Sequence, residues 1–145
     1  MNVKHKMYLI VFSLALSACS ARSTFQATDG ELQVKINDNP SITVTESVTQ
    51  EYPTTSFGQY KFKVSAEGQE PMYGLLPLKF NGGYLAADII LFAPAMFFNL
   101  REVFPYYQFD VAEGVVKYKK KDAKEWITYK PTPAEIQHAK TYFHE

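Results

Sequence analysis

The sequence has few of the residues that support covalent or metal chemistry. It contains 145 residues, among them one cysteine, Cys19, and three histidines. A single cysteine excludes a disulfide framework within the chain. The two histidines past Cys19, His138 and His144, are expected on a solvated helix end rather than in a zinc site. The sequence contains no G-x-S-x-G, H-E-x-x-H or phosphate-cradling glycine motif, so we expect no cofactor, no metal and no enzymatic activity.

An excess of positive charge is also missing. The 15 Lys and Arg residues balance the 15 Asp and Glu residues, which argues against nucleic acid as a partner because such proteins carry a basic excess. A hydrophobic content of 46% excludes disorder of the whole chain. We therefore expect a small globular protein.

The N-terminal segment has the organisation of a signal peptide. Lys4, His5 and Lys6 form a basic head, and the apolar run over 7–16 has the length of a signal-peptide core rather than of a membrane span. The tetrad Leu16-Ser17-Ala18-Cys19 then resembles the lipobox of bacterial lipoproteins. The resemblance implies that residues 1–18 are removed and that Cys19 becomes an acylated N-terminus carrying palmitate-type chains. An ordinary secretory signal with an incidental cysteine, or a buried cysteine, are the alternatives.

The same resemblance implies a location in the bacterial cell envelope. Acyl chains on Cys19 would hold the protein on a membrane essentially permanently. Enterobacterial lipoproteins retained in the inner membrane tend to have Asp at the next position, so Ser20 favours the outer membrane, facing the periplasm. Residues 19–30 are small, polar and without periodicity, which predicts a tether between lipid and domain.

Alternating apolar and polar residues predict a β-rich single domain over 31–145. The pattern and the turn residues between its segments predict strands over 31–36, 41–46, 58–64, 72–80 (broken near Gly74 or Pro77), 109–111, 115–119 and 125–129. Thr132-Pro133-Ala134-Glu135 has the form of a capping box and predicts a short helix over 133–143. The fold class expected is mainly β (α+β): a small antiparallel β-sandwich-like domain with an apolar helical insertion and a C-terminal helix.

A further resemblance covers residues 34–71. The run Gly58-Gln59-Tyr60-Lys61-Phe62-Lys63-Val64, followed by Gly68 and Pro71, resembles the closing strand of PEGA-type domains, which are β modules of envelope lipoproteins. Asp38 departs from the glycine usual in that family, and 39–57 does not match its short connection. The resemblance implies a β fold with an attachment or binding role and carries no catalytic residues.

The segment 81–107 interrupts the strand pattern with many aromatic and aliphatic residues. Its uncharged stretch, 89–100, is too short for a spanning helix, which needs about 20 residues. In one interpretation, 84–93 forms a helix and Phe92, Phe97 and Phe98 fill the core beneath the sheet. In the other, an apolar helix pair contacts the bilayer interface or an envelope partner. The candidate contact residues are Tyr84, Ile89, Phe92, Phe97, Phe98 and Phe104, with Tyr106 and Tyr107 also at headgroup level.

Asp88 is the only carboxylate between Lys79 and Arg101. A buried acid needs a donor, so we expect an ion pair with Arg101 or hydrogen bonds from the amides near Gly82 and Gly83. The alternative is a general acid or base in an aromatic-lined pocket of an enzyme or enzyme inhibitor.

A basic cluster near the C-terminus completes the candidates. It consists of Lys117, Lys119, Lys120, Lys121 and Lys124, with Tyr118, Asp122 and Glu125 interleaved and Trp126 following. It is interpreted as a solvated hairpin tip, with attraction to anionic headgroups or cell-wall polymers as the functional alternative. Taken together, the sequence predicts a non-enzymatic, membrane-anchored envelope lipoprotein that binds or scaffolds an envelope protein or cell-wall polymer.

Overall fold

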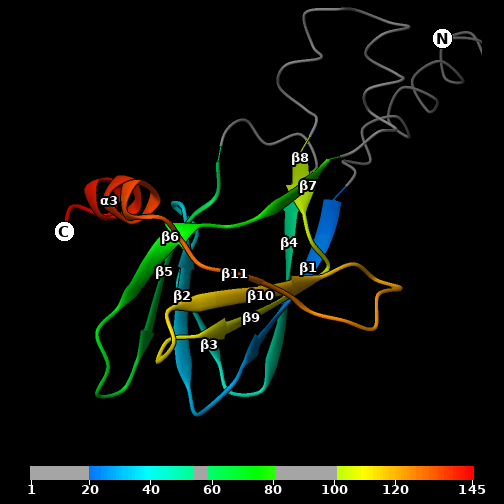
Figure 1. The fold of residues 1–145 in the computed structure, drawn as a ribbon, viewed down its shortest axis with the longest axis horizontal. Helices are drawn as coiled ribbons and strands as arrows, with labels where there is room; N and C mark the ends of the chain where they lie inside the picture. Colours follow the sequence, from blue (N-terminus) through cyan, green and yellow to red (C-terminus); the bar gives the residue numbers. More distant parts are fainter. Residues whose placement is uncertain (1–19, 54–58, 81–100) are drawn as a thin grey trace, which may run out of the picture.

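A computed structural model describes residues 20–53, 59–80 and 101–145 of the chain (Figure 1). Most of the described chain is β-strand, arranged in two main sheets that share one core, and one helix lies near the C-terminus. The predicted sandwich-like β fold with a C-terminal helix is therefore confirmed. The predicted helix over 84–93 lies outside the described residues.

The larger sheet has five strands. Their order across the sheet is β11 (Ile127–Tyr129), β10 (Val115–Lys119), β9 (Tyr106–Asp110), β1 (Ser20–Ala27) and β4 (Ser47–Pro53). Neighbours run antiparallel except β1 and β9, which pair in parallel with Thr24 opposite Tyr106. Strand β1 therefore joins the chain's first described segment to a segment about eighty residues later.

The second sheet has four strands and is built mainly by local hairpins. Its order is β3 (Ile42–Val44), β2 (Leu32–Ile36), β5 (Lys61–Ala66) and β6 (Met72–Leu75). A separate two-stranded ladder pairs β7 (Leu78–Phe80) with β8 (Arg101–Val103). The predicted break in 72–80 falls at Leu76 and Pro77, where the chain leaves the second sheet and enters this ladder.

Aromatic rings fill the space between the sheets. Phe25 of β1 lies at their centre, stacked on Tyr107 and Phe109 at centroid distances of 5.7 and 5.8 Å. Phe62 of the second sheet meets Phe109 at 5.4 Å, so the two inner faces are in direct contact. Burial of several large side chains is the main source of stability for a domain of this size.

The C-terminal helix α3 (Pro133–Tyr142) begins as the sequence predicts. The Thr132 hydroxyl accepts a hydrogen bond from the Glu135 amide, and the Glu135 carboxylate accepts one from the Thr132 amide at 2.7 Å. The helix packs against β6, with Ala139 fully buried. Gly74 of β6 provides the room, because an added Cβ there would lie 2.7 Å from a Pro131 ring carbon.

Two predictions from the sequence are wrong. Residues 20–27 of the predicted tether form strand β1, because Ala21, Ser23 and Phe25 alternate toward the core and both edges of the strand are paired. The predicted strands also leave out 47–53, which forms strand β4. Its inward residues are Val48, Gln50 and Tyr52, and the amide of Gln50 obscures the apolar alternation that signals a strand.

Candidate functional site

The predicted lipidation residue, Cys19, lies outside the described residues, but its neighbour does not. Ser20 is exposed and is the first residue of β1, opposite Pro53 of β4. Consecutive Cα atoms are about 3.8 Å apart, so Cys19 is within one residue of the folded sheet. Because β1 begins immediately after it, the described chain leaves no spacer between Cys19 and the sandwich.

Five of the six predicted contact residues, and the predicted acid, fall in the range 81–100. Tyr84, Ile89, Phe92, Phe97, Phe98 and the acid Asp88 all lie outside the described residues. Arg101, the predicted partner of Asp88, is exposed on β8. The proposed ion pair between them therefore remains a prediction.

Phe104 and Tyr107 are not contact residues. The range 101–107, predicted as the end of the apolar insertion, contains β8 and the first residues of β9. Phe104 is 6% exposed because its ring packs against Tyr118 at 4.5 Å and against the edge of Tyr107 at 6.3 Å. Tyr107 is fully buried, and its hydroxyl donates to the Pro77 carbonyl and accepts from the Phe104 amide. Both rings therefore belong to the core.

Strands β1, β4 and β8 bring separated parts of the chain to one end of the sandwich. The Ser23 hydroxyl donates to the Phe104 carbonyl at 2.8 Å, and the Thr24 amide donates to the Pro105 carbonyl at 2.8 Å. Since β9 then continues parallel to β1, β8 lies beside the first residues of β1. We call this the β1–β8 end and define it by Ser20, Arg22, Phe80 and Arg101; Figure 1 shows it at the top of the molecule.

Exposed side chains at the β1–β8 end are aromatic and charged. Phe80 is 60% exposed and faces its ladder partner Arg101 across β7 and β8. Lys79 forms an ion pair with Glu102, and Arg22 forms one with Glu51 at 2.7 Å. Both pairs lie on cross-strand neighbours. The Lys79–Glu102 pair is half-buried, whereas the Arg22–Glu51 pair is exposed, and exposed pairs contribute little stability.

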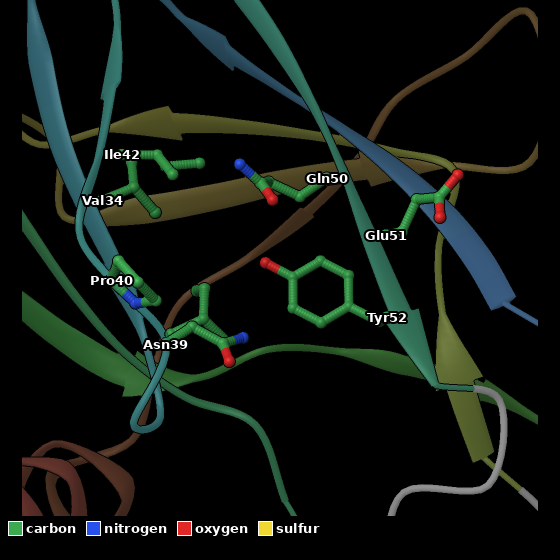
Figure 2. A pocket seen from close by; sticks show the side chains of 8 residues that line it. Val34, Asn39, Pro40, Ile42, Gln50, Glu51 and Tyr52 are labelled. Atoms are coloured by element: carbon green, nitrogen blue, oxygen red, sulfur yellow. The ribbon is translucent and has the colours of Figure 1, made fainter.

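A pocket lies at the open edge of the sandwich, between β2, the turn before β3, and β4. Its volume is about 220 Å³, and its walls are formed by Val34, Ile36, Asn39, Pro40, Ile42, Gln50, Glu51 and Tyr52. Strands β3 and β4 are edge strands of their sheets, so no strand of the described residues covers this side. Figure 2 shows the Tyr52 hydroxyl and the Gln50 amide directed toward the apolar wall, while Glu51 points away.

The pocket combines polar groups with an apolar wall. Tyr52 is 3% exposed, and burial, followed by the nearby Tyr60, raises the pKa of its hydroxyl well above the usual range. The hydroxyl therefore stays protonated and can donate or accept a hydrogen bond. Glu51 is held outside by Arg22. A hydroxyl and two amides beside apolar side chains can hold a ligand with one polar group on an apolar body.

The lysines of the predicted basic cluster fall into two groups, those that contact an acidic or aromatic side chain and those that are exposed. Lys117 lies 3.7 Å from Asp110, and Lys119 lies over the rings of Tyr106 and Trp126 at 5.2 and 4.7 Å. Lys120, Lys121 and Lys124 are exposed in the loop after β10. Three lysines of the predicted cluster are thus available to solvent.

A second group of polar side chains joins α3 to the smaller sheet. Glu145 accepts hydrogen bonds from Lys63 and from the Tyr73 hydroxyl, and these two bonds, that of Lys63 first, lower the pKa of its carboxyl. The ammonium of Lys140 lies 5.4 Å from the Tyr73 ring centre. These contacts fix the end of the chain to β5 and β6. Sequence reasoning missed them because the two partners of Glu145 lie 82 and 72 residues away from it in the sequence.

The described residues contain no helix with the length and apolar character needed to cross a membrane. Within the same part of the chain, no three His, Cys, Asp or Glu residues gather where they could share a metal ion. Comparisons with protein-family models, curated proteins and solved structures find no match to this chain. The PEGA-like resemblance over 34–71 remains a prediction.

Proposed function

We propose that this protein is a membrane-anchored bacterial envelope lipoprotein with a non-enzymatic binding or scaffolding role. Cys19 is the acylated first residue of the mature chain, and the outer membrane, on its periplasmic side, is the location that Ser20 favours. The partner is an envelope protein or a cell-wall polymer.

The observation that carries the proposal is the junction between the lipobox and the fold. The tetrad Leu16-Ser17-Ala18-Cys19 ends one residue before β1. Each buried methylene contributes about 0.8 kcal/mol to membrane binding, so two or three acyl chains hold a protein on the bilayer stably where one does not. A chain joined in this way presents its sandwich directly at the membrane surface.

The pocket between β2 and β4 supports a binding role. Apolar side chains supply contact area, and the protonated Tyr52 hydroxyl and the Gln50 amide supply directional hydrogen bonds. Burial of such groups in a complex penalises a partner that leaves them unpaired, which gives specificity.

Lipid attachment is tested with Cys19→Ala. We expect the wild-type chain to be recovered from cells in the membrane fraction, with a mass increased by acyl chains on residue 19. Cys19→Ala should lose the added mass and leave the membrane fraction, whereas the control Ser20→Ala should keep both. A Cys19→Ala protein that still fractionates with membranes would contradict the proposal.

Partner binding is tested by placing a photo-crosslinking amino acid in the pocket. At Ile42, the probe should give adducts of discrete mass in intact cells, and Tyr52→Phe in the same chain should reduce them. A probe at Glu67, in the exposed turn after β5, is the matched control. Equal adducts from both positions would contradict a binding role for the pocket.

A further inference from the structure

The position of Ser20 fixes which part of the sandwich lies nearest to an acylated Cys19. Strand β1 starts at Ser20, so the first residue of the β1–β8 end is one Cα spacing, about 3.8 Å, from the lipid-bearing residue. The eight residues of β1 span about 25 Å, and the turn 111–114 lies beyond the other end of the strand. The two ends of the sheet are therefore held at different distances from the anchor.

The side chains at the β1–β8 end suit contact with a bilayer. Phe80 is one of two large apolar side chains that are exposed among the described residues; the other is Ile127, which is 49% exposed on β11. Aromatic rings favour the interface between headgroups and acyl chains. Arg101, opposite Phe80, places positive charge beside it, and basic residues near a surface are attracted to anionic headgroups.

The paired strands make this end one rigid surface. Ser20 is bound in register to the end of β4, and β8 is fixed to β1 through the bonds from Ser23 and Thr24 to the chain at 104–105. Phe80 is in turn paired with Arg101 of β8. An anchor on Cys19, next to Ser20, therefore brings Phe80 and Arg101 toward the same surface.

We propose that the β1–β8 end is a membrane-facing surface, on which Phe80 enters the headgroup region of the bilayer that holds the lipid of Cys19. The opposite end, with the turn 111–114, faces away from the membrane. This inference rests on the proposed lipid attachment and adds to it a fixed orientation of the domain.

The orientation is measured on the lipidated full-length product reconstituted in vesicles of phosphatidylcholine and phosphatidylglycerol. The sequence has no cysteine besides Cys19, so a single introduced cysteine takes a fluorescent label specifically once lipid occupies the Cys19 thiol. Arg101→Cys places the label at the β1–β8 end. Glu113→Cys is the matched control in the exposed turn at the opposite end.

With a nitroxide on the lipid headgroups, we expect quenching at position 101 to be several-fold stronger than at position 113. Equal quenching, or stronger quenching at 113, in a protein that carries lipid and floats with the vesicles overturns the orientation alone. The mass of the product is measured before the vesicles are prepared. A product whose mass shows no lipid overturns the proposed attachment and the orientation together.

Phe80 is tested separately through its own environment. Trp126 is the only tryptophan, so Trp126→Phe gives a background in which Phe80→Trp reports on one site. We expect its emission to shift to the blue on reconstitution and to be quenched by brominated acyl chains. Ile127→Trp in the same background should do neither. An unshifted signal at position 80, or equal shifts at both positions, overturns insertion of Phe80.

Discussion

Single buried hydroxyls connect parts of this fold that are distant in sequence. Tyr107 is fully buried among rings, and its hydroxyl satisfies both the Phe104 amide and the Pro77 carbonyl. Ser23, also fully buried, satisfies the Phe104 carbonyl. Because a buried polar group without a partner is costly, these contacts fix the path of the chain from β8 into β9.

Replacing Tyr107 by Phe removes the hydroxyl and leaves an amide and a carbonyl unpaired in the core. We expect a loss of about 1–3 kcal/mol in the free energy of unfolding, measured by urea denaturation of the non-lipidated Cys19→Ala chain. Tyr106→Phe, on the half-buried neighbour, should change stability by less than about 0.5 kcal/mol. Equal losses from both variants would show that the hydroxyl of Tyr107 is not the cause.

At the scale of elements, β1 and the start of α3 differ in whether they depend on distant or on adjacent residues. The structure places β1 between β4 and β9, so it is an interior strand rather than a tether. The helix is defined by its capping box and by the fit of Gly74 against Pro131. Strand β1 therefore depends on partners that are distant in sequence, whereas the start of α3 depends on four adjacent residues.

Strand β1 is tested with Phe25→Ala. The ring is fully buried against Tyr52, Tyr107 and Phe109, so its removal should cost about 3–5 kcal/mol in the urea experiment. Arg22→Ala, in the same strand but exposed and paired only with Glu51, should cost less than about 1 kcal/mol. A tether would tolerate both substitutions, so a stable Phe25→Ala protein would contradict the assignment of β1.

The helix start is tested with Thr132→Ala. Loss of the cap should destabilise the protein by about 1 kcal/mol. Thr141→Ala, which is exposed inside the helix, should be neutral or slightly stabilising because alanine has the higher helix propensity. Similar losses at both positions in urea denaturation would contradict a specific capping role.

The capping box also makes stability depend on pH. Burial raises the pKa of the Glu135 carboxyl, but hydrogen bonds from Tyr129 and Thr132 outweigh it and the net pKa lies below the usual 4.5. A depressed pKa means that the carboxylate stabilises the fold above pH 4.5, and that this contribution is lost as the pH falls through the lower, folded-state value. Glu135→Gln should therefore be less stable than wild type at pH 7, and the difference should shrink at pH 3. A difference that is constant between these pH values would contradict this role.

At the scale of the whole molecule, the fold and the proposed lipid attachment at Cys19 together give the domain two different ends. One end of the sandwich begins at Ser20, and the turns 28–31 and 111–114 lie at the other. The pocket between β2 and β4 opens at the side, along the edge strands β3 and β4.

The membrane that receives the protein is tested at Ser20. The resemblance to enterobacterial lipoproteins implies that Ser20→Asp moves the protein from outer-membrane to inner-membrane fractions on a density gradient. Ser20 is exposed, so the aspartate leaves the fold intact and any shift reports on sorting. Ser20→Ala should remain in the outer-membrane fractions. An unchanged distribution of Ser20→Asp would contradict this sorting rule for the chain.

The sequence by itself determined the features that depend on near neighbours. The alternation over 31–36 predicted strand β2, and the four residues from Thr132 predicted the start of α3 because a cap is made by adjacent groups. Only the tertiary structure decided that 20–27 is a strand and that Phe104 is buried, since their partners lie as far as 82 residues away. Strand pairing and ring packing join residues that are close in space but distant in sequence. A small residue such as Ser23 gives little local indication in the sequence that it belongs to a buried strand. For the same reason, the meeting of Ser20, Phe80 and Arg101 at one end became visible only once the chain was folded.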